Sequence, residues 1–166
     1  MIFGSYNKFV IDSGPLLIHA ASVFENGALL SNSVSGIPAP DIQGVANTID
    51  RLLCSAKAVY LTPYVLAEFC NLANCRLGLK DSRLERFLNI YHEFFLKTRE
   101  WQCKKEDLIA FKKSLKFCFT DSSVAFASKE NGIPLLSIDG KLVNWCKSQG
   151  IDAKHLYYEI YLSEMQ

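Results

Sequence analysis

The chain has 166 residues, of which 49% are hydrophobic and 21% are charged, and its formal net charge is +1. This length predicts one domain with a proper core, the composition excludes intrinsic disorder, and the net charge favours no class of partner. No apolar run is long enough to cross a membrane, and the N-terminus lacks the pattern of a signal peptide. We therefore expect a cytoplasmic protein with no membrane partner.

Six cysteines occur without CxxC spacing, and most lie in apolar runs. The pattern predicts buried, reduced thiols rather than zinc ligands or a disulfide framework. A single oxidised pair stays open at this level.

The N-terminal part predicts a strand, a helix and a loop. The strand covers residues 8–11 and ends at Asp12. A helix follows, because Pro15 suits the first helical turn and apolar residues continue to about residue 21. Residues 25–43 contain clusters of Asn, Gly, Ser and Pro, which predict a long loop inserted into the single domain.

A helix over about 43–55 and a strand over 59–61 come next. Thr62 then caps a helix that continues to about residue 76. Glu68 lies within the apolar stripe of this helix, and Asn71 lies nearly one turn further along the same side.

The middle of the chain predicts an amphipathic helix over 82–97, an edge strand or bend at 101–103, and a helix over 106–115. Residues 97–116 carry seven basic residues against three acids, a local charge of +4. The basic residues are Lys97, Arg99, Lys104, Lys105, Lys112, Lys113 and Lys116. Both a solvated helix face and a phosphate-contacting surface agree with this run.

The C-terminal part begins with a helix, capped by Thr120 or Asp121 and stopped at Gly132. A buried strand over 134–138 ends at Asp139. Expected after it are a helix over 142–150, a strand over 151–154 and a short helix over 155–166. The alternation of strands and helices predicts an α/β fold with a mostly parallel central sheet and helices on both faces.

Four acids lie at marked points of this pattern: Asp12, Glu68, Asp121 and Asp139. The carboxyl ends of parallel strands share one sheet edge, so Asp12 and Asp139 should meet there, and the two helical acids can face the same edge. The plain structural alternatives are helix capping for Asp12 and Asp121, and a simple turn position before Gly140 for Asp139. For Glu68 the alternative is a solvent-facing position, and for Ser13 it is local capping of the backbone.

Four carboxylates in one cleft repel one another unless a cation lies between them. A set of oxygen ligands without His or Cys favours a hard ion, so we expect Mg²⁺ or Mn²⁺. Such a site suits hydrolysis of a phosphodiester bond.

The segments FVIDSG (9–14), LTPYVLAEFCNL (61–72) and FTDSSVAFASKENGIPLLSIDGKL (119–142) resemble the PIN-domain nucleases, and the resemblance runs along most of the chain. It implies a PIN-like fold over residues 1–166 and a metal-dependent endoribonuclease acting on single-stranded or structured RNA. The implied catalytic and metal-binding acids are Asp12, Glu68, Asp121 and Asp139. Ser13 matches the family's hydroxyl after the first acid, and Asn71 is a supporting candidate.

Many small members of that family are toxins of bacterial toxin–antitoxin pairs and are commonly dimers. The resemblance therefore implies a homodimer and an antitoxin partner, although the 25–43 loop makes this chain longer than compact toxins. The apolar segment 64–75 and the aromatic helix near Phe94 independently predict an exposed apolar surface. A PIN-fold module that binds RNA or protein without cleaving is the alternative function.

Overall fold

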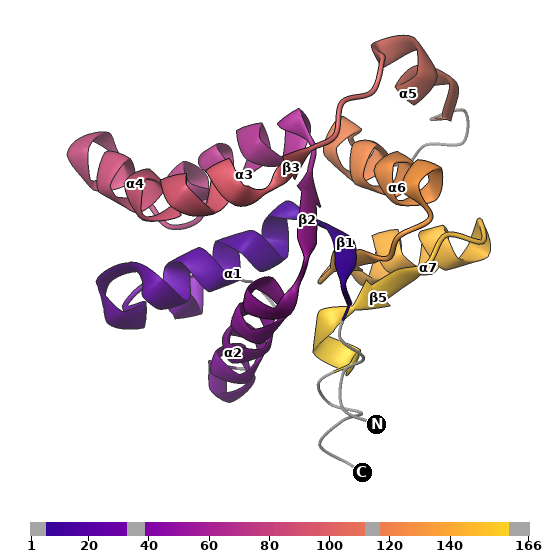
Figure 1. Ribbon diagram of the computed structural model, residues 1–166. Coiled ribbons are helices and arrows are strands. Elements are labelled where there is room, and N and C mark those ends of the chain that lie inside the picture. The colour runs from indigo at the N-terminus through magenta and orange to yellow at the C-terminus, as the bar shows by residue number, and fades with distance from the viewer. Residues whose placement is uncertain (1–5, 33–38, 112–116, 160–166) are drawn as a thin grey trace.

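The computed structural model describes residues 6–32, 39–111 and 117–159 (Figure 1). All five strands of the central sheet are parallel, in the order β3-β2-β1-β4-β5. They are β1 (Lys8–Ile11), β2 (Ala58–Leu61), β3 (Arg99–Glu100), β4 (Leu135–Ser137) and β5 (Ala153–His155). The predicted α/β class with a parallel sheet is confirmed.

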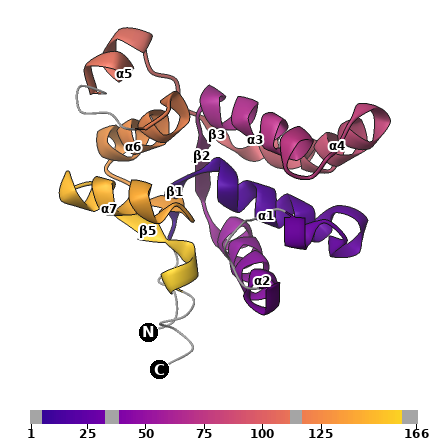
Figure 2. The same ribbon diagram turned by 180° about the vertical axis from the view of Figure 1, so that it is seen from behind.

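Helices flank the sheet on both sides, as predicted. In Figures 1 and 2, α1 and α2 lie on one side of β1 and β2, whereas α6 and α7 lie on the other. The α-helices are α1 (Ser13–Val23), α2 (Ala39–Ser55), α3 (Pro63–Cys75), α4 (Asp81–Lys97), α5 (Lys105–Phe111), α6 (Phe119–Asn131) and α7 (Gly140–Ser148). Among the described residues, no helix is both long and apolar enough to cross a bilayer.

The strand order creates a switch point between β1 and β4. The chain leaves β1 through α1 and α2 to reach β2 on one side, whereas β4 lies on the other side of β1. Connections that diverge from two neighbouring parallel strands open a crevice beyond their carboxyl ends, where ligands bind in open α/β sheets. Asp12 follows β1 directly, and Asp139 comes two residues after β4.

The segment predicted as a loop over 25–43 is more ordered than expected. Two short 3-10 helices, η1 (Phe24–Gly27) and η2 (Leu30–Asn32), occupy its first part, and α2 begins at Ala39 rather than near residue 43. Proline is compatible with the first turn of a helix, so Pro40 does not prevent this earlier start. Residues 33–38 of the predicted loop lie outside the described residues.

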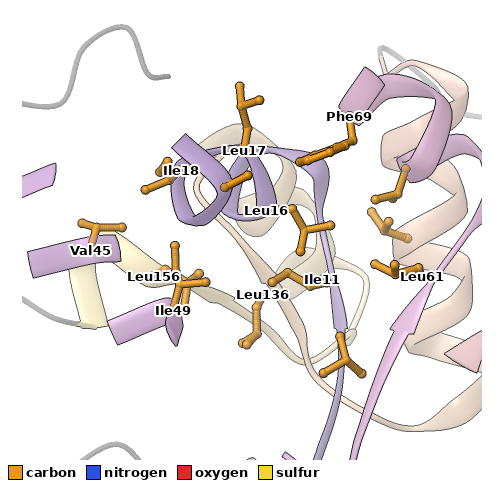
Figure 3. Packing of buried hydrophobic residues seen from close by; sticks show 14 of the residues in the cluster. Ile11, Leu16, Leu17, Ile18, Val45, Ile49, Leu61, Phe69, Leu136 and Leu156 are labelled. Atoms are coloured by element: carbon orange, nitrogen blue, oxygen red, sulfur yellow. The ribbon is translucent and has the colours of Figure 1, made fainter. Parts of the chain in front are cut away.

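The core joins the sheet to its helices. Figure 3 shows Ile11 of β1 and Leu136 of β4 packed near Leu16 of α1, and all three side chains are buried. Phe69 of α3 is completely buried, and its ring lies 5.4 Å from that of Tyr91 in α4, centroid to centroid. This aromatic contact holds the helix that carries Glu68 against its neighbour.

Tyr91 also joins a polar contact between three helices. The His19 ring of α1 hydrogen-bonds to the Tyr91 hydroxyl through Nδ1, and its Nε2 lies 3.0 Å from Asp50 Oδ1 of α2. Burial raises the pKa of the Tyr91 phenol well above its ordinary value, so the hydroxyl stays neutral. His19 therefore has a structural role, because it connects α1 with α2 and α4.

All six cysteines are free, but the expectation that most are buried is wrong. Cys54, Cys70, Cys75 and Cys118 are exposed, Cys103 is intermediate and Cys146 is buried. An apolar run in a helix exposes some of its members, because only one face of the helix packs on the core.

Candidate active site

Asp12 is the most deeply buried of the predicted acids, with 6% of its surface exposed. It N-caps α1, and its Oδ1 accepts a hydrogen bond of 2.7 Å from the Ser13 N–H. Its Oδ2 accepts one of 2.7 Å from the Ser137 hydroxyl at the end of β4. Ser137 Oγ in turn accepts a bond of 2.9 Å from the Asp139 N–H, which ties the ends of β1 and β4 together.

Ser13 links the first acid to the acid on α3. Its hydroxyl donates to Glu68 Oε2 at 2.8 Å and lies 3.4 Å from Asp12 Oδ1. One hydroxyl therefore bridges two carboxylates that are far apart in the sequence. The structure brings Asp12 and Glu68 together, as the sequence predicts.

Asp139 lies at the exposed N-terminus of α7, beyond the end of β4. Its Oδ1 accepts hydrogen bonds from the backbone N–H groups of Lys141 at 2.7 Å and Leu142 at 3.2 Å. Asp139 is therefore the N-cap of α7 through Oδ1, rather than a simple turn residue before Gly140. Capping fixes the position of the carboxylate, and Oδ2 accepts no hydrogen bond from the residues that the structure describes.

Asp121 occupies the first turn of α6, but it does not cap the helix. The helix begins at Phe119, with Cys118 at the N-cap position, so the prediction that Thr120 or Asp121 is the cap is wrong. The first helical turn still favours a negative charge there, because free N–H groups and the helix dipole face that end. Gly132 ends the helix in the left-handed conformation, as predicted (φ 60°).

The charges of the four acids act on one another. Burial raises the pKa of Asp12 to about 6, and although the Ser137 hydrogen bond opposes this shift, the charges of Asp121 and Glu68 add to it. Burial also raises the pKa of Asp121, and the charges of Glu68 and Asp139 contribute in the same direction. Each acid therefore takes part in at least one repulsive interaction within the set.

The charges of two of the acids also act on the buried Cys146 thiol. Burial raises the pKa of the Cys146 thiol to about 12, and the charges of Asp121 and Asp12 add to that shift. Within the described ranges, none of the ion pairs involves Asp12, Glu68, Asp121 or Asp139. The cluster of acids has no protein cation paired with it in this part of the chain.

A divalent cation fits this donor set by its chemistry. The described residues contain no group of three His, Cys, Asp or Glu side chains placed to hold a metal ion. The donors are nevertheless all carboxylate and hydroxyl oxygens, which Mg²⁺ and Mn²⁺ prefer over softer metals. Burial is the main cause of the raised pKa of Asp12, and a cation between the acids would offset the repulsion from Asp121 and Glu68 that adds to it.

Three further residues bear on the site: Asn71, a supporting candidate from the sequence, and the hydroxyl residues Ser137 and Thr62. Asn71 is exposed on α3 and makes no hydrogen bond to the four acids among the described contacts. Ser137 was not singled out and Thr62 was predicted only as a helix cap, yet both are buried, and Thr62 Oγ1 lies 2.7 Å from Ser123 Oγ of α6. A lone hydroxyl within an apolar strand was the signal for Ser137.

A pocket of about 310 Å³ lies beside the acids rather than among them. It is lined by α7, which contributes Lys147, by His155 at the end of β5, and by residues that follow β5, including Tyr158. Gly140, next to Asp139, belongs to its wall. None of the four acids is among its lining residues.

Comparison with known proteins supports the fold only. No protein-family model matches the chain, and no curated protein shows significant similarity to it. The chain is similar to the crystal structure of PAE2754 from Pyrobaculum aerophilum, with a TM-score of 0.55 and 11% sequence identity. That similarity covers 98% of this chain and 100% of the other, so the α/β architecture extends over nearly the whole sequence.

Proposed function

We propose that the protein is a Mg²⁺- or Mn²⁺-dependent endoribonuclease whose acids are Asp12, Glu68, Asp121 and Asp139. The main support is Asp12, a buried carboxylate whose pKa is raised further by Asp121 and Glu68 and which lacks a paired cation among the described residues. Structural carboxylates usually have a compensating partner, whereas metal sites tolerate such repulsion because the ion removes it.

The chain's own residues would orient the acids. Ser137 and the Ser13 N–H hold the two oxygens of Asp12, and the Ser13 hydroxyl holds Glu68. The N-terminus of α7 fixes Asp139. A bound divalent cation supplies a Lewis acid for the phosphate and lowers the pKa of a coordinated water.

The partners follow from the same proposal. RNA is the substrate. Phosphate contacts are available from four exposed basic residues, Lys97, Arg99, Lys104 and Lys105. The other three basic residues of this run, Lys112, Lys113 and Lys116, lie outside the described residues. The resemblance to PIN-domain toxins supports a homodimer and an antitoxin as further partners. Ile90 and Leu96 of α4, 46% and 68% exposed, provide apolar surface for a protein contact.

The experiment is RNA cleavage in Mn²⁺ by wild type and by Glu68→Gln. A pool of single-stranded and structured RNAs serves as substrate. The variant is expected to cleave at least about 100-fold more slowly, which corresponds to roughly 3 kcal/mol of lost transition-state stabilisation. Glu130→Gln is the matched control, since Glu130 is exposed on α6 and makes none of the contacts described at the four acids.

One observation favours the alternative of a binding module without catalysis. No three acidic side chains in the described segments are arranged to hold an ion. Wild type that binds RNA but cleaves no faster in Mn²⁺ than in EDTA would establish that alternative and reject the nuclease. Equal activity of wild type and Glu68→Gln would reject the assigned acids.

A further inference from the structure

Two aromatic side chains lie at the N-terminal ends of the helices that carry Glu68 and Asp121. Tyr64 is in the first turn of α3, and Phe119 is the first residue of α6. Their ring planes are 18° apart and their centroids are 6.1 Å apart, so the rings are stacked nearly parallel. Phe119 is 45% exposed although it is a large apolar residue.

A buried hydrogen-bond network holds the two helix ends in place. Thr62 caps α3 by accepting a bond of 3.3 Å from the Val65 N–H. Its Oγ1 lies 2.7 Å from Ser123 Oγ, and the Ser123 hydroxyl also contacts the Thr120 carbonyl at 2.7 Å. Thr62 and Ser123 are 1% and 0% exposed, so the hydrogen bond between them is buried and fixes the helix ends that carry Tyr64 and Phe119.

The pair is adjacent to the acids. Glu68 lies four residues after Tyr64 on α3, which is one helical turn along the same face. Asp121 lies two residues after Phe119, and the charge of Glu68 acts on it. A ligand that contacts the aromatic pair therefore lies about one helical turn from Glu68.

Four negatively charged acids cannot attract an RNA phosphate by themselves, so binding energy must come from groups beside them. Single-stranded RNA offers bases whose faces stack on aromatic side chains, and such stacking is worth about 1–3 kcal/mol per base. Stacking on a neutral ring is unaffected by the charge repulsion that opposes the phosphate.

We propose that Phe119, supported by Tyr64, is a stacking platform for one nucleobase of single-stranded RNA next to the acids. This proposal depends on the endoribonuclease function for the identity of the ligand. Stacking reads the face of a base rather than its hydrogen-bonding edge, so the platform accepts all four bases.

The test compares binding of two labelled oligomers, an oligoadenylate and an abasic ribose-phosphate chain of the same length. Fluorescence anisotropy is measured in Ca²⁺, and gel electrophoresis afterwards checks that the oligomers are intact. Phe119→Ala is expected to weaken oligoadenylate binding about 10-fold and to leave abasic binding unchanged. The slope of log affinity against log salt should stay the same, because no phosphate contact is removed.

Two further variants keep the test interpretable. Phe119→Trp, which keeps a stacking surface, should bind oligoadenylate at least as tightly as wild type. Ile109→Ala removes an apolar side chain of α5 that is 55% exposed, and it should not change binding of either oligomer. Far-UV circular dichroism of each variant confirms folding, and Phe119→Leu replaces Phe119→Ala if the latter is unfolded.

Any of three results would overturn the platform. They are an equal loss of affinity for both oligomers in Phe119→Ala, equal effects of Phe119→Ala and Ile109→Ala, and no binding of oligoadenylate by wild type. Cleavage of the oligoadenylate by wild type in Mn²⁺ is measured in parallel. Cleavage without a base-dependent effect of Phe119→Ala rejects the platform and leaves the nuclease standing. A base-dependent effect without cleavage supports the platform and rejects the nuclease.

Discussion

Asp12→Asn is expected to raise the free energy of unfolding of the metal-free protein at pH 7 by up to about 3 kcal/mol. The pKa of Asp12 rises from 3.8 to about 6 in the folded state, mainly because the carboxyl is buried. Each unit of raised pKa corresponds to about 1.4 kcal/mol lost from the folded state once the group is ionised. The same change should abolish metal-dependent cleavage.

The effect has a defined pH dependence. Below the unfolded-state pKa of 3.8, Asp12 is protonated in both states and contributes no penalty. Between that value and about 6 the folded state holds the proton more tightly, so wild-type stability falls as the pH rises through this interval. Urea unfolding of both proteins in EDTA, near pH 4 and at pH 7, measures the difference, which should be small at the lower pH.

Asn fits the site without the charge. Its oxygen can accept from the Ser13 N–H, and its amide can donate to Ser137 Oγ, whose own O–H is free to turn. Asp107→Asn, at an exposed position of α5, is the matched control and should shift stability by less than about 0.5 kcal/mol. If Asp12→Asn is less stable than wild type at both pH values, the Asp12 carboxylate stabilises the fold as a helix cap, and its charge does not destabilise the metal-free protein.

Phe69→Ala is expected to destabilise the protein by about 3–5 kcal/mol. The ring is fully buried and contacts the rings of Phe87, Tyr91 and Phe95, at centroid distances of 5.6, 5.4 and 5.4 Å. Its removal leaves a cavity between α3 and α4 that these large neighbours cannot fill completely. Chemical denaturation followed by circular dichroism measures the loss.

The neighbouring position provides the control for Phe69. Cys70 is exposed on the same helix, so Cys70→Ala should change the free energy of unfolding by less than about 0.5 kcal/mol. A loss below about 1 kcal/mol for Phe69→Ala would show that α3 does not pack on α4 through this ring. The position of Glu68 would then need another explanation.

The sequence predicted the parts of the site that follow from strand endings. Asp12 and Asp139 follow short apolar runs, and parallel strands necessarily bring such residues to one edge. Glu68 was identifiable because an acid within an apolar helical stripe must have a polar partner, here the Ser13 hydroxyl.

Other features depend on contacts that no local pattern records. The two residues of β3, Arg99 and Glu100, are both exposed, so the strand has no apolar alternation and exists because it pairs with β2. The start of α6 was misplaced because Cys118 is not a favoured N-cap residue. The role of Ser137 arises only when β4 lies beside β1.

The central claim is that the four acids bind a divalent cation, and thermal unfolding of wild type and Asp121→Asn with and without Mn²⁺ tests it most directly. Without metal, the variant should be more stable by about 1 kcal/mol, because one repelling charge is gone. With Mn²⁺ at about 100 times its Kd, wild type should gain about 2.7 kcal/mol and the variant should lose most of that gain. Equal shifts of both proteins on addition of Mn²⁺ would contradict the account.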